Sequence, residues 1–135
     1  MASQLKVDTI TGVTTAGSIS VTGEGNSTTT NLQQGLAKAF CNFNGTSAVN
    51  NDSFNISGRT DHGTGDFTIT FTNNFNVASG MCGPALAGRN SGVADDVYAT
   101  AYDLNTTDIR YNILHDGGSL DDCGTVGATV HGDLA

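Results

Sequence analysis

The residues best suited to chemistry in this sequence are two acids in a glycine-rich stretch. Asp61 and Asp66 flank Gly63 and Gly65. A pair of carboxylates can supply the acid and the base or nucleophile of glycoside hydrolysis, and carboxylates in a tight loop can bind Ca²⁺. The spacing fits neither an EF-hand nor a repeated calcium-binding nonapeptide. Because Asp and Gly are also common residues of turns between strands, we interpret the stretch as a turn and treat hydrolysis and calcium binding as alternatives.

Two further acidic pairs and three histidines lie in separate contexts. The pairs Asp95-Asp96 and Asp121-Asp122 are interpreted in the same way, as acids of connecting loops. His62, His115 and His131 do not have the spacing of a metal-binding motif. A three-fold axis would present one histidine three times, and His131 is the candidate for that position, the alternative being a solvated strand residue. No Ser or Cys lies in a nucleophile elbow, and neither the acids nor the histidines have the spacing of a catalytic or metal-binding motif, so within one chain we expect no catalytic residue, no cofactor and no metal.

Short strands must position these residues. Phe67, Ile69 and Phe71 alternate with threonines, which predicts a half-buried antiparallel strand. Asn44-Gly45 suits a turn with positive φ, and the stretch 61–66 is expected to interrupt the chain between two strands. The other predicted strands are 37–43, 53–57, 97–102, 109–114 and 123–131, together with an edge strand over 81–86, within the segment 77–88, that is limited to an edge by Pro84.

The composition supports an all-β protein with a modest core. The chain has 135 residues, of which 37% are hydrophobic and 7% aromatic, with no Trp, 18 glycines and one proline. Chains of this length seldom form two independent cores, and abundant Gly favours short strands and turns. We therefore predict a small antiparallel β-sandwich over residues 36–135, preceded by an extended N-terminal segment over residues 1–35.

Charge and cysteine usage restrict the partners and the compartment. The net charge is -8, whereas phosphate binding depends on clustered Lys and Arg, so a nucleic-acid partner is not expected. The sequence has neither a signal peptide nor a stretch that could span a bilayer, which predicts synthesis in a cytoplasm without membrane insertion. Cys41, Cys82 and Cys123 are odd in number, and we expect all three thiols to be unpaired within the chain.

The first 35 residues differ from the rest in having scattered aliphatic side chains and no aromatic residue. Such a segment cannot bury enough surface alone. Identical copies wound around an axis would give each aliphatic side chain a partner, which predicts a homotrimer. Residues 23–27 are expected to form a turn or linker and residues 31–35 a short helical turn or bend. The side chains predicted to mediate trimer formation or attachment are Leu5, Val7, Ile10, Val13, Ile19 and Val21.

Several stretches resemble a domain of tailed-bacteriophage fibre proteins. The similarity covers residues 36–72 well, is thinner over 73–120, and returns at Val130-His131-Gly132-Asp133. Where the family commonly has Trp-Val followed by Asn-Phe-Asn-Gly, this chain has Phe40-Cys41 and then the same four residues. The opening segment 3–10 is similar to the start of many phage virion proteins. The quoted stretches are Leu36 to Phe40, Asn42 to Thr46, Asp52 to Ser57, Asp61, and Gly63 to Thr68.

The resemblance implies a homotrimeric fibre or fibre-tip protein, assembled in the host cytoplasm and carried on the tail or head of the virion. Its N-terminal segment would bind other virion proteins, and its loops would contact a glycan or protein of the host surface. One alternative is a capsid decoration or cement protein. Another is a glycan-degrading depolymerase, which a chain this short would have to build across subunits. The loop residues predicted to face outward are Arg89, Asn90, Asp95, Asp96, His115, Asp116, Asp121 and Asp122.

Overall fold

The computed structural model describes residues 4–12, 19–22, 28–47, 49–83, 85–88, 97–115 and 117–135. It divides the chain into two compact units, Met1–Leu36 and Ala37–Ala135. We refer to them as the N-terminal unit and the sandwich unit and describe each by itself.

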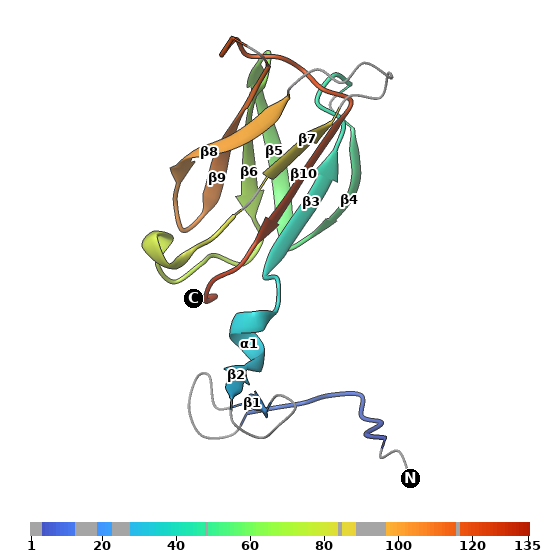
Figure 1. The fold of residues 1–135 in the computed structure, drawn as a ribbon, viewed down its shortest axis with the longest axis vertical. Helices are drawn as coiled ribbons and strands as arrows, with labels where there is room; N and C mark the ends of the chain where they lie inside the picture. Colours follow the sequence, from blue (N-terminus) through green and yellow to red (C-terminus); the bar gives the residue numbers. More distant parts are fainter. Residues whose placement is uncertain are drawn as a thin grey trace. The chain divides into compact units, whose positions relative to one another are not determined.

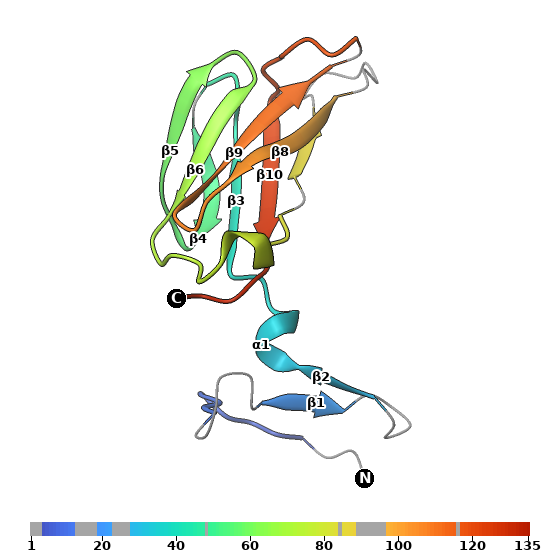
Figure 2. The same ribbon diagram turned by 90° about the vertical axis from the view of Figure 1, so that its left-hand side faces the viewer.

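The N-terminal unit contains a small hairpin followed by a single turn of helix (Figure 2). Strands β1 (Ser20–Thr22) and β2 (Thr29–Asn31) pair antiparallel, and helix α1 (Leu32–Gly35) follows directly. The Leu32 N–H donates to the Ile19 carbonyl oxygen at 2.8 Å and so ties the start of the helix to the hairpin. The helical turn predicted for residues 31–35 is confirmed, whereas the turn predicted for residues 23–27 lies outside the described residues.

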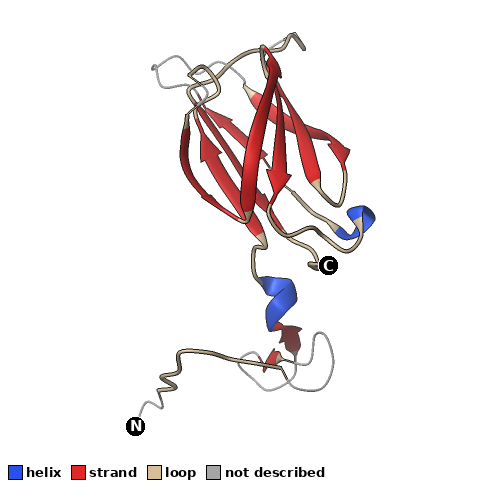
Figure 3. Ribbon diagram, turned by 180° about the vertical axis from the view of Figure 1, so that it is seen from behind, coloured by secondary structure: helices blue, strands red, loops and turns tan. Residues whose placement is uncertain are grey.

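The sandwich unit is built from two four-stranded antiparallel sheets that pack face to face (Figure 1, Figure 3). The first sheet has the order β4-β3-β10-β7 and the second β5-β6-β9-β8. The predicted all-β class and antiparallel pairing are therefore confirmed. The strands are β3 (Ala39–Phe43), β4 (Asn50–Phe54), β5 (Ile56–Gly63), β6 (Asp66–Phe71), β7 (Ala85–Gly88), β8 (Tyr98–Leu104), β9 (Asp108–Leu114) and β10 (Thr125–Val130).

Alternation along the inner strands creates the core between the sheets. In β6 the residues Phe67, Ile69 and Phe71 are buried and the threonines between them face outward, as predicted. The Phe43 ring of the first sheet meets the Phe67 ring of the second in an edge-to-face contact at 5.2 Å. The Arg59 guanidinium covers the Phe43 ring at 4.6 Å. Burying each such aromatic side chain stabilises the fold by about 1.5–3 kcal/mol.

The chain crosses from the first sheet to the second at Asn55. We predicted one strand over residues 53–57, and this is wrong: Phe54 pairs with Phe40 in the first sheet, whereas Ile56 pairs with Phe71 in the second. Asn55 has a φ of 57°, a conformation that Asn tolerates better than most residues and that ends β4 and redirects the chain. Its side chain holds the crossing in place, because Oδ1 accepts from the Asn73 N–H at 2.7 Å and Nδ2 donates to the Asn73 carbonyl oxygen at 3.1 Å.

The turns differ from the sequence prediction at two places. β5 continues through Gly63 and β6 begins at Asp66, so the stretch 61–66 is mostly strand and only two residues form the turn. A register shift between Asp61 and Gly63 lets the strand continue through glycine. The expected positive φ at Asn44-Gly45 is also wrong, since φ is not positive there. Gly45 is required for space, because an added Cβ would lie 2.8 Å from the backbone oxygen of Cys123.

The segment 77–88, predicted to contain an edge strand, contains two elements. A 3₁₀ turn, η1 (Ala78–Gly80), is followed by β7, which begins at Ala85 and pairs only with β10 at the edge of its sheet. The edge position is thus confirmed, but the strand begins later than expected, and Pro84 lies outside the described residues. The strands predicted over 97–102, 109–114 and 123–131 correspond to β8, β9 and β10.

Candidate functional site

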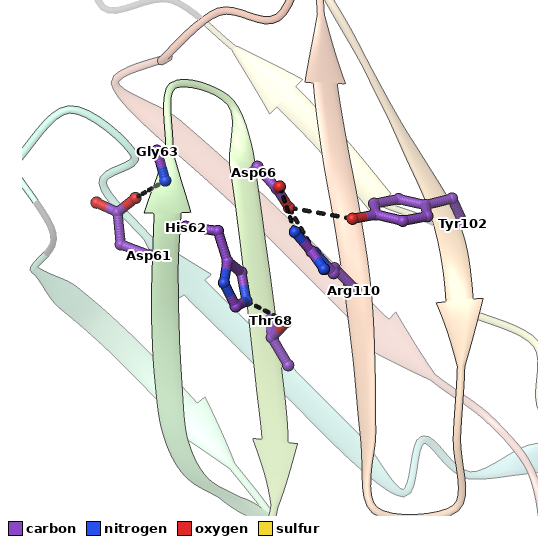
Figure 4. A network of polar contacts seen from close by, with 7 residues as sticks. All are labelled: Asp61, His62, Gly63, Asp66, Thr68, Tyr102 and Arg110. Atoms are coloured by element: carbon purple, nitrogen blue, oxygen red, sulfur yellow. Dashed lines mark hydrogen bonds and ion pairs between the residues drawn. The ribbon is translucent and has the colours of Figure 1, made fainter.

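A network of polar side chains lies on the outer face of the second sheet (Figure 4). Arg110 of β9 donates from Nε to Asp66 Oδ1 at 2.8 Å and from Nη2 to Asp66 Oδ2 at 2.6 Å. The Tyr102 hydroxyl of β8 donates to the same Oδ1 at 3.4 Å, and the Arg110 guanidinium lies 5.3 Å from the Tyr102 ring centroid. Three neighbouring strands therefore place a carboxylate, a guanidinium and a phenol side by side.

The Arg110 hydrogen bonds hold the pKa of Asp66 below its ordinary value of 3.8. A carboxylate clamped at both oxygens by a guanidinium stays ionised and has little remaining capacity to accept a proton from a substrate. The pair orders the outer face of the sheet because it joins β6 to β9 across their hydrogen-bonded ladder.

The two acids considered for catalysis or calcium binding have separate partners. Asp61 Oδ1 accepts from the Gly63 N–H at 2.9 Å, which closes a tight local turn within β5. Figure 4 shows this carboxylate and that of Asp66 directed to different partners. His62 Nε2 and Thr68 Oγ1 lie 2.8 Å apart across β5 and β6. These side chains thus form three local contacts on the sheet and do not converge on one point.

We expect replacement of Asp66 by asparagine to reduce the dependence of stability on acid pH. The folded-state pKa of Asp66 is lowered, so its ionisation stabilises the fold above the ordinary pKa of 3.8, and this stabilisation is lost as the pH falls below that value. Denaturant unfolding of wild type and Asp66→Asn, measured at intervals from pH 6 to pH 3, should give a flatter profile for the variant.

Asp61→Asn is the matched control for this measurement, since an asparagine Oδ1 can still accept from the Gly63 N–H. Its profile should be steeper than that of Asp66→Asn, because the Asp66–Arg110 pair is intact. Equal profiles for wild type and Asp66→Asn would contradict the assigned role of the Asp66–Arg110 pair.

Within the part of the chain that the structure describes, metal-binding side chains do not cluster. Among the residues that it describes, no three His, Cys, Asp or Glu side chains lie close enough together to hold an ion. His131 pairs with Cys82 in an isolated antiparallel bridge, with backbone hydrogen bonds of 2.9 and 3.0 Å. His131 therefore lies directly after β10, in a bridge outside the named strands, and its role at a three-fold axis stays a prediction.

The loop over residues 115–122 has an ordered base. The Asp122 carboxylate accepts from the Gly65 N–H at 2.7 Å, so it fastens this loop to the β5–β6 turn. Within the loop the Gly118 N–H donates to the His115 carbonyl oxygen at 3.0 Å. Asp121 and Asp122 are half-buried, whereas residues 117–120 are exposed. The surface that this loop offers to a partner is therefore its tip. The other predicted contact residues, Arg89, Asn90, Asp95, Asp96 and Asp116, lie outside the described residues.

None of the three thiols forms a disulfide within the chain, as predicted, but their environments differ. Cys41 and Cys123 are buried and Cys82 is exposed. Burial raises the pKa of the Cys41 thiol from 9.0 to about 11. Cys41 is thus a small core residue, and Cys82 is the thiol that a reagent in solution can reach.

Native alkylation with iodoacetamide should therefore modify Cys82 rapidly and reach the other two thiols only after unfolding.

Because the folded-state pKa of Cys41 is raised, the stability due to its neutral thiol is complete below pH 9 and is lost between pH 9 and about 11. Cys41→Ala should weaken the loss of stability between pH 9 and pH 10 in denaturant titrations. In the alkylation experiment, rapid labelling of Cys41 in the native protein, detected by mass spectrometry, would contradict its placement in the core.

Four of the six aliphatic side chains predicted to mediate attachment are exposed within one chain. Leu5, Val7, Ile10 and Val21 are between 50 and 81% exposed, and Ile19 is partly buried. Val13 lies outside the described residues. Within the described ranges every helix is too short to cross a membrane.

Sequence reasoning missed Tyr102 and Arg110, and it also missed two exposed phenylalanines, Phe40 and Phe54, on the outer face of the first sheet. For Phe40 a signal existed, because alternation with the buried Ala39 and Cys41 places its side chain outward. Nothing local marks Tyr102, since its position follows from a register shift between Ala101 and Asp103.

No protein-family model, curated protein or solved structure matches this chain.

Proposed function

We propose that this chain is a structural protein of a bacteriophage virion, the subunit of a homotrimeric fibre on the tail or head of the particle. One observation carries the proposal: the N-terminal unit exposes Leu5, Val7, Ile10 and Val21 within a single chain. Apolar side chains that a unit cannot cover by itself favour association with other copies or with a neighbouring protein. The resemblance of residues 36–72 to phage fibre proteins is the reason for assigning the chain to a phage particle.

In this proposal the two units have separate tasks. The N-terminal unit forms the attachment to other virion proteins and begins the trimer. The sandwich unit is the outward part, where the tip of the loop at residues 117–120 contacts a glycan or protein of the host surface. A structural role is favoured over hydrolysis because the acids that a depolymerase would need, Asp61 and Asp66, are engaged by Gly63 and Arg110.

Sedimentation velocity of the full chain tests the oligomeric state. We expect the mass of three chains at micromolar concentration, and a folded monomer would contradict the proposal. Labelling the chain in assembled particles and imaging them by electron microscopy tests its location. Label at a fibre supports the proposal, whereas label spread evenly over the capsid surface would indicate a cement protein.

Deletion of residues 2–30 tests the attachment task separately. The deletion removes the exposed aliphatic side chains and leaves the core of the sandwich unit intact. We expect the shortened chain to be absent from purified particles although it is soluble in the host. Normal incorporation would show that attachment resides elsewhere.

A further inference from the structure

The turn that follows β3 contains a dipeptide that reacts with itself in flexible chains. Asn44-Gly45 is the one Asn-Gly dipeptide in the sequence. Asn is a chemically labile residue, and a glycine after it presents a backbone nitrogen that no Cβ shields. In an open chain this nitrogen can attack the side-chain amide of the residue before it. The turn therefore carries a possible modification site that the proposed function does not use.

The reaction consumes only water and needs no catalytic residue. After the Gly45 N–H loses its proton to hydroxide, the nitrogen attacks Asn44 Cγ, a C–N bond forms, and the side-chain nitrogen leaves as ammonia. Water then opens the cyclic imide at either of its carbonyl groups. One opening gives aspartate, and the other gives isoaspartate, in which the main chain runs through the former side chain. The net result is that water is consumed, ammonia is released and a neutral amide becomes a carboxylate.

The fold engages the nitrogen that would attack. The Gly45 N–H donates to the Cys123 carbonyl oxygen at 2.9 Å, and Gly45 is buried. The fit is close, because an added Cβ at Gly45 would lie 2.8 Å from the same oxygen. A proton in a buried hydrogen bond is hard for hydroxide to reach, and breaking the bond leaves the Cys123 oxygen without this donor. The nucleophile is therefore available only after the turn opens.

The group that would be attacked is held as well. Asn44 Oδ1 accepts from the Ser47 N–H at 2.9 Å, which directs the side-chain amide along the turn. The main chain of the same residue is fixed on both sides, since the Asn44 N–H donates to the Val49 carbonyl oxygen at 2.8 Å and the Asn44 carbonyl oxygen accepts from Arg59 Nη1 at 3.3 Å. The Asn44 amide must leave these contacts before Cγ can reach the Gly45 nitrogen.

We propose that Asn44 is a site of spontaneous deamidation that the folded turn suppresses and that becomes reactive when the contact between Gly45 and Cys123 opens. Isoaspartate adds one carbon to the main chain between residues 44 and 45, so the lengthened turn no longer fits beneath Cys123. Deamidation thus makes an opening of the turn irreversible. The proposal is independent of the virion role and of the oligomeric state.

Incubation of the full chain at mildly alkaline pH, in buffer and in concentrated guanidinium chloride, tests the suppression. Peptide mass spectrometry of samples taken at intervals gives the fraction of Asn44 that is converted. We expect conversion in guanidinium chloride to be faster than in buffer by about a hundredfold or more, because the folded chain must first open at the turn. Comparable rates in the two solutions would overturn the proposal.

The variant Asp116→Asn provides a matched control within the same protein. It creates a second Asn-Gly dipeptide, since residue 117 is glycine, and Gly117 is exposed whereas Gly45 is buried. In the folded variant we expect the substituted position to convert much faster than Asn44. In guanidinium chloride the two positions should convert at similar rates, because the local sequence alone then decides. Equal rates at both positions in the folded variant would contradict the protection by the turn.

The variant Asn44→Asp tests whether the main-chain change causes the irreversibility. An aspartate retains the Oδ1 that accepts from the Ser47 N–H, so this variant should refold with an unfolding midpoint close to that of wild type. Wild-type chains converted in guanidinium chloride and then refolded should separate into two groups. Those with aspartate should recover the midpoint of Asn44→Asp, whereas those with isoaspartate, identified by enzymatic methylation, should have a lower one. Equal midpoints for the two groups would overturn the irreversible step.

Discussion

Replacement of Gly65 by alanine is expected to lower the free energy of unfolding by more than about 3 kcal/mol. Gly65 is buried in the β5–β6 turn with a φ of 64°, where a residue with a side chain is strained. An added Cβ would lie 2.6 Å from the Ile113 carbonyl oxygen and 2.7 Å from the Asp121 nitrogen. Both are backbone atoms, so neither can move aside without disturbing β9 or the loop that follows it.

The expected loss also includes the contacts that Gly65 makes. Its N–H donates to Asp122 Oδ1 at 2.7 Å, and its carbonyl oxygen accepts from the Ile113 N–H at 2.7 Å. Chemical denaturation of purified Gly65→Ala provides the measurement. Gly58→Ala is the matched control, because Gly58 lies in the neighbouring strand, where an added Cβ meets nothing within 4 Å. It should be neutral or slightly stabilising. Similar stabilities for the two variants would show that the turn is not packed as described.

Replacement of Phe67 by alanine should cost about 3–5 kcal/mol, because it removes a fully buried ring and leaves a cavity between the sheets. Phe67 contacts the Phe43 ring across the core and lies 5.5 Å from the Arg59 guanidinium. Loss of the Phe67 ring therefore exposes Phe43 and removes one of the two rings that the Arg59 guanidinium covers. The midpoints of thermal and of chemical unfolding should both be strongly lowered in the variant.

Tyr98→Ala is the control for this prediction, since it deletes an aromatic side chain that is already 47% exposed on an outer face. Its effect on stability should be within about 1 kcal/mol. If the two alanine variants were equally destabilised, the core would not lie between the two sheets. Together with Gly65→Ala, this pair separates the packing of the core from the packing of the turn at its end.

The two outer faces of the sandwich unit differ in the side chains that they expose. The face of the second sheet is polar and internally paired through Asp66, Arg110 and Tyr102, which keeps it compatible with water. The face of the first sheet leaves the stacked rings of Phe40 and Phe54 exposed to water.

The sequence alone was sufficient to predict the fold class and the buried face of the strands with the clearest alternation. Strict alternation at Phe67, Ile69 and Phe71 determines which side of β6 is buried, because successive side chains of a strand point to opposite faces. Cysteine count and context likewise predicted three free thiols. Such features depend on neighbours in the chain and need no knowledge of distant contacts.

Only the tertiary structure decided where the chain changes sheets and which polar groups meet. The crossing at Asn55 depends on Asn73, and the turn at Gly65 depends on Asp122, a residue 57 positions later. Asp66 became half of an ion pair because β6 and β9 are neighbours, which brings Arg110 to it from 44 positions away. Local sequence carries no information on these distances, since strand order and register are set by the packing of the whole core. The role of a carboxylate that the sequence alone presents as a candidate for catalysis therefore depends on which strand lies next to it in the folded protein.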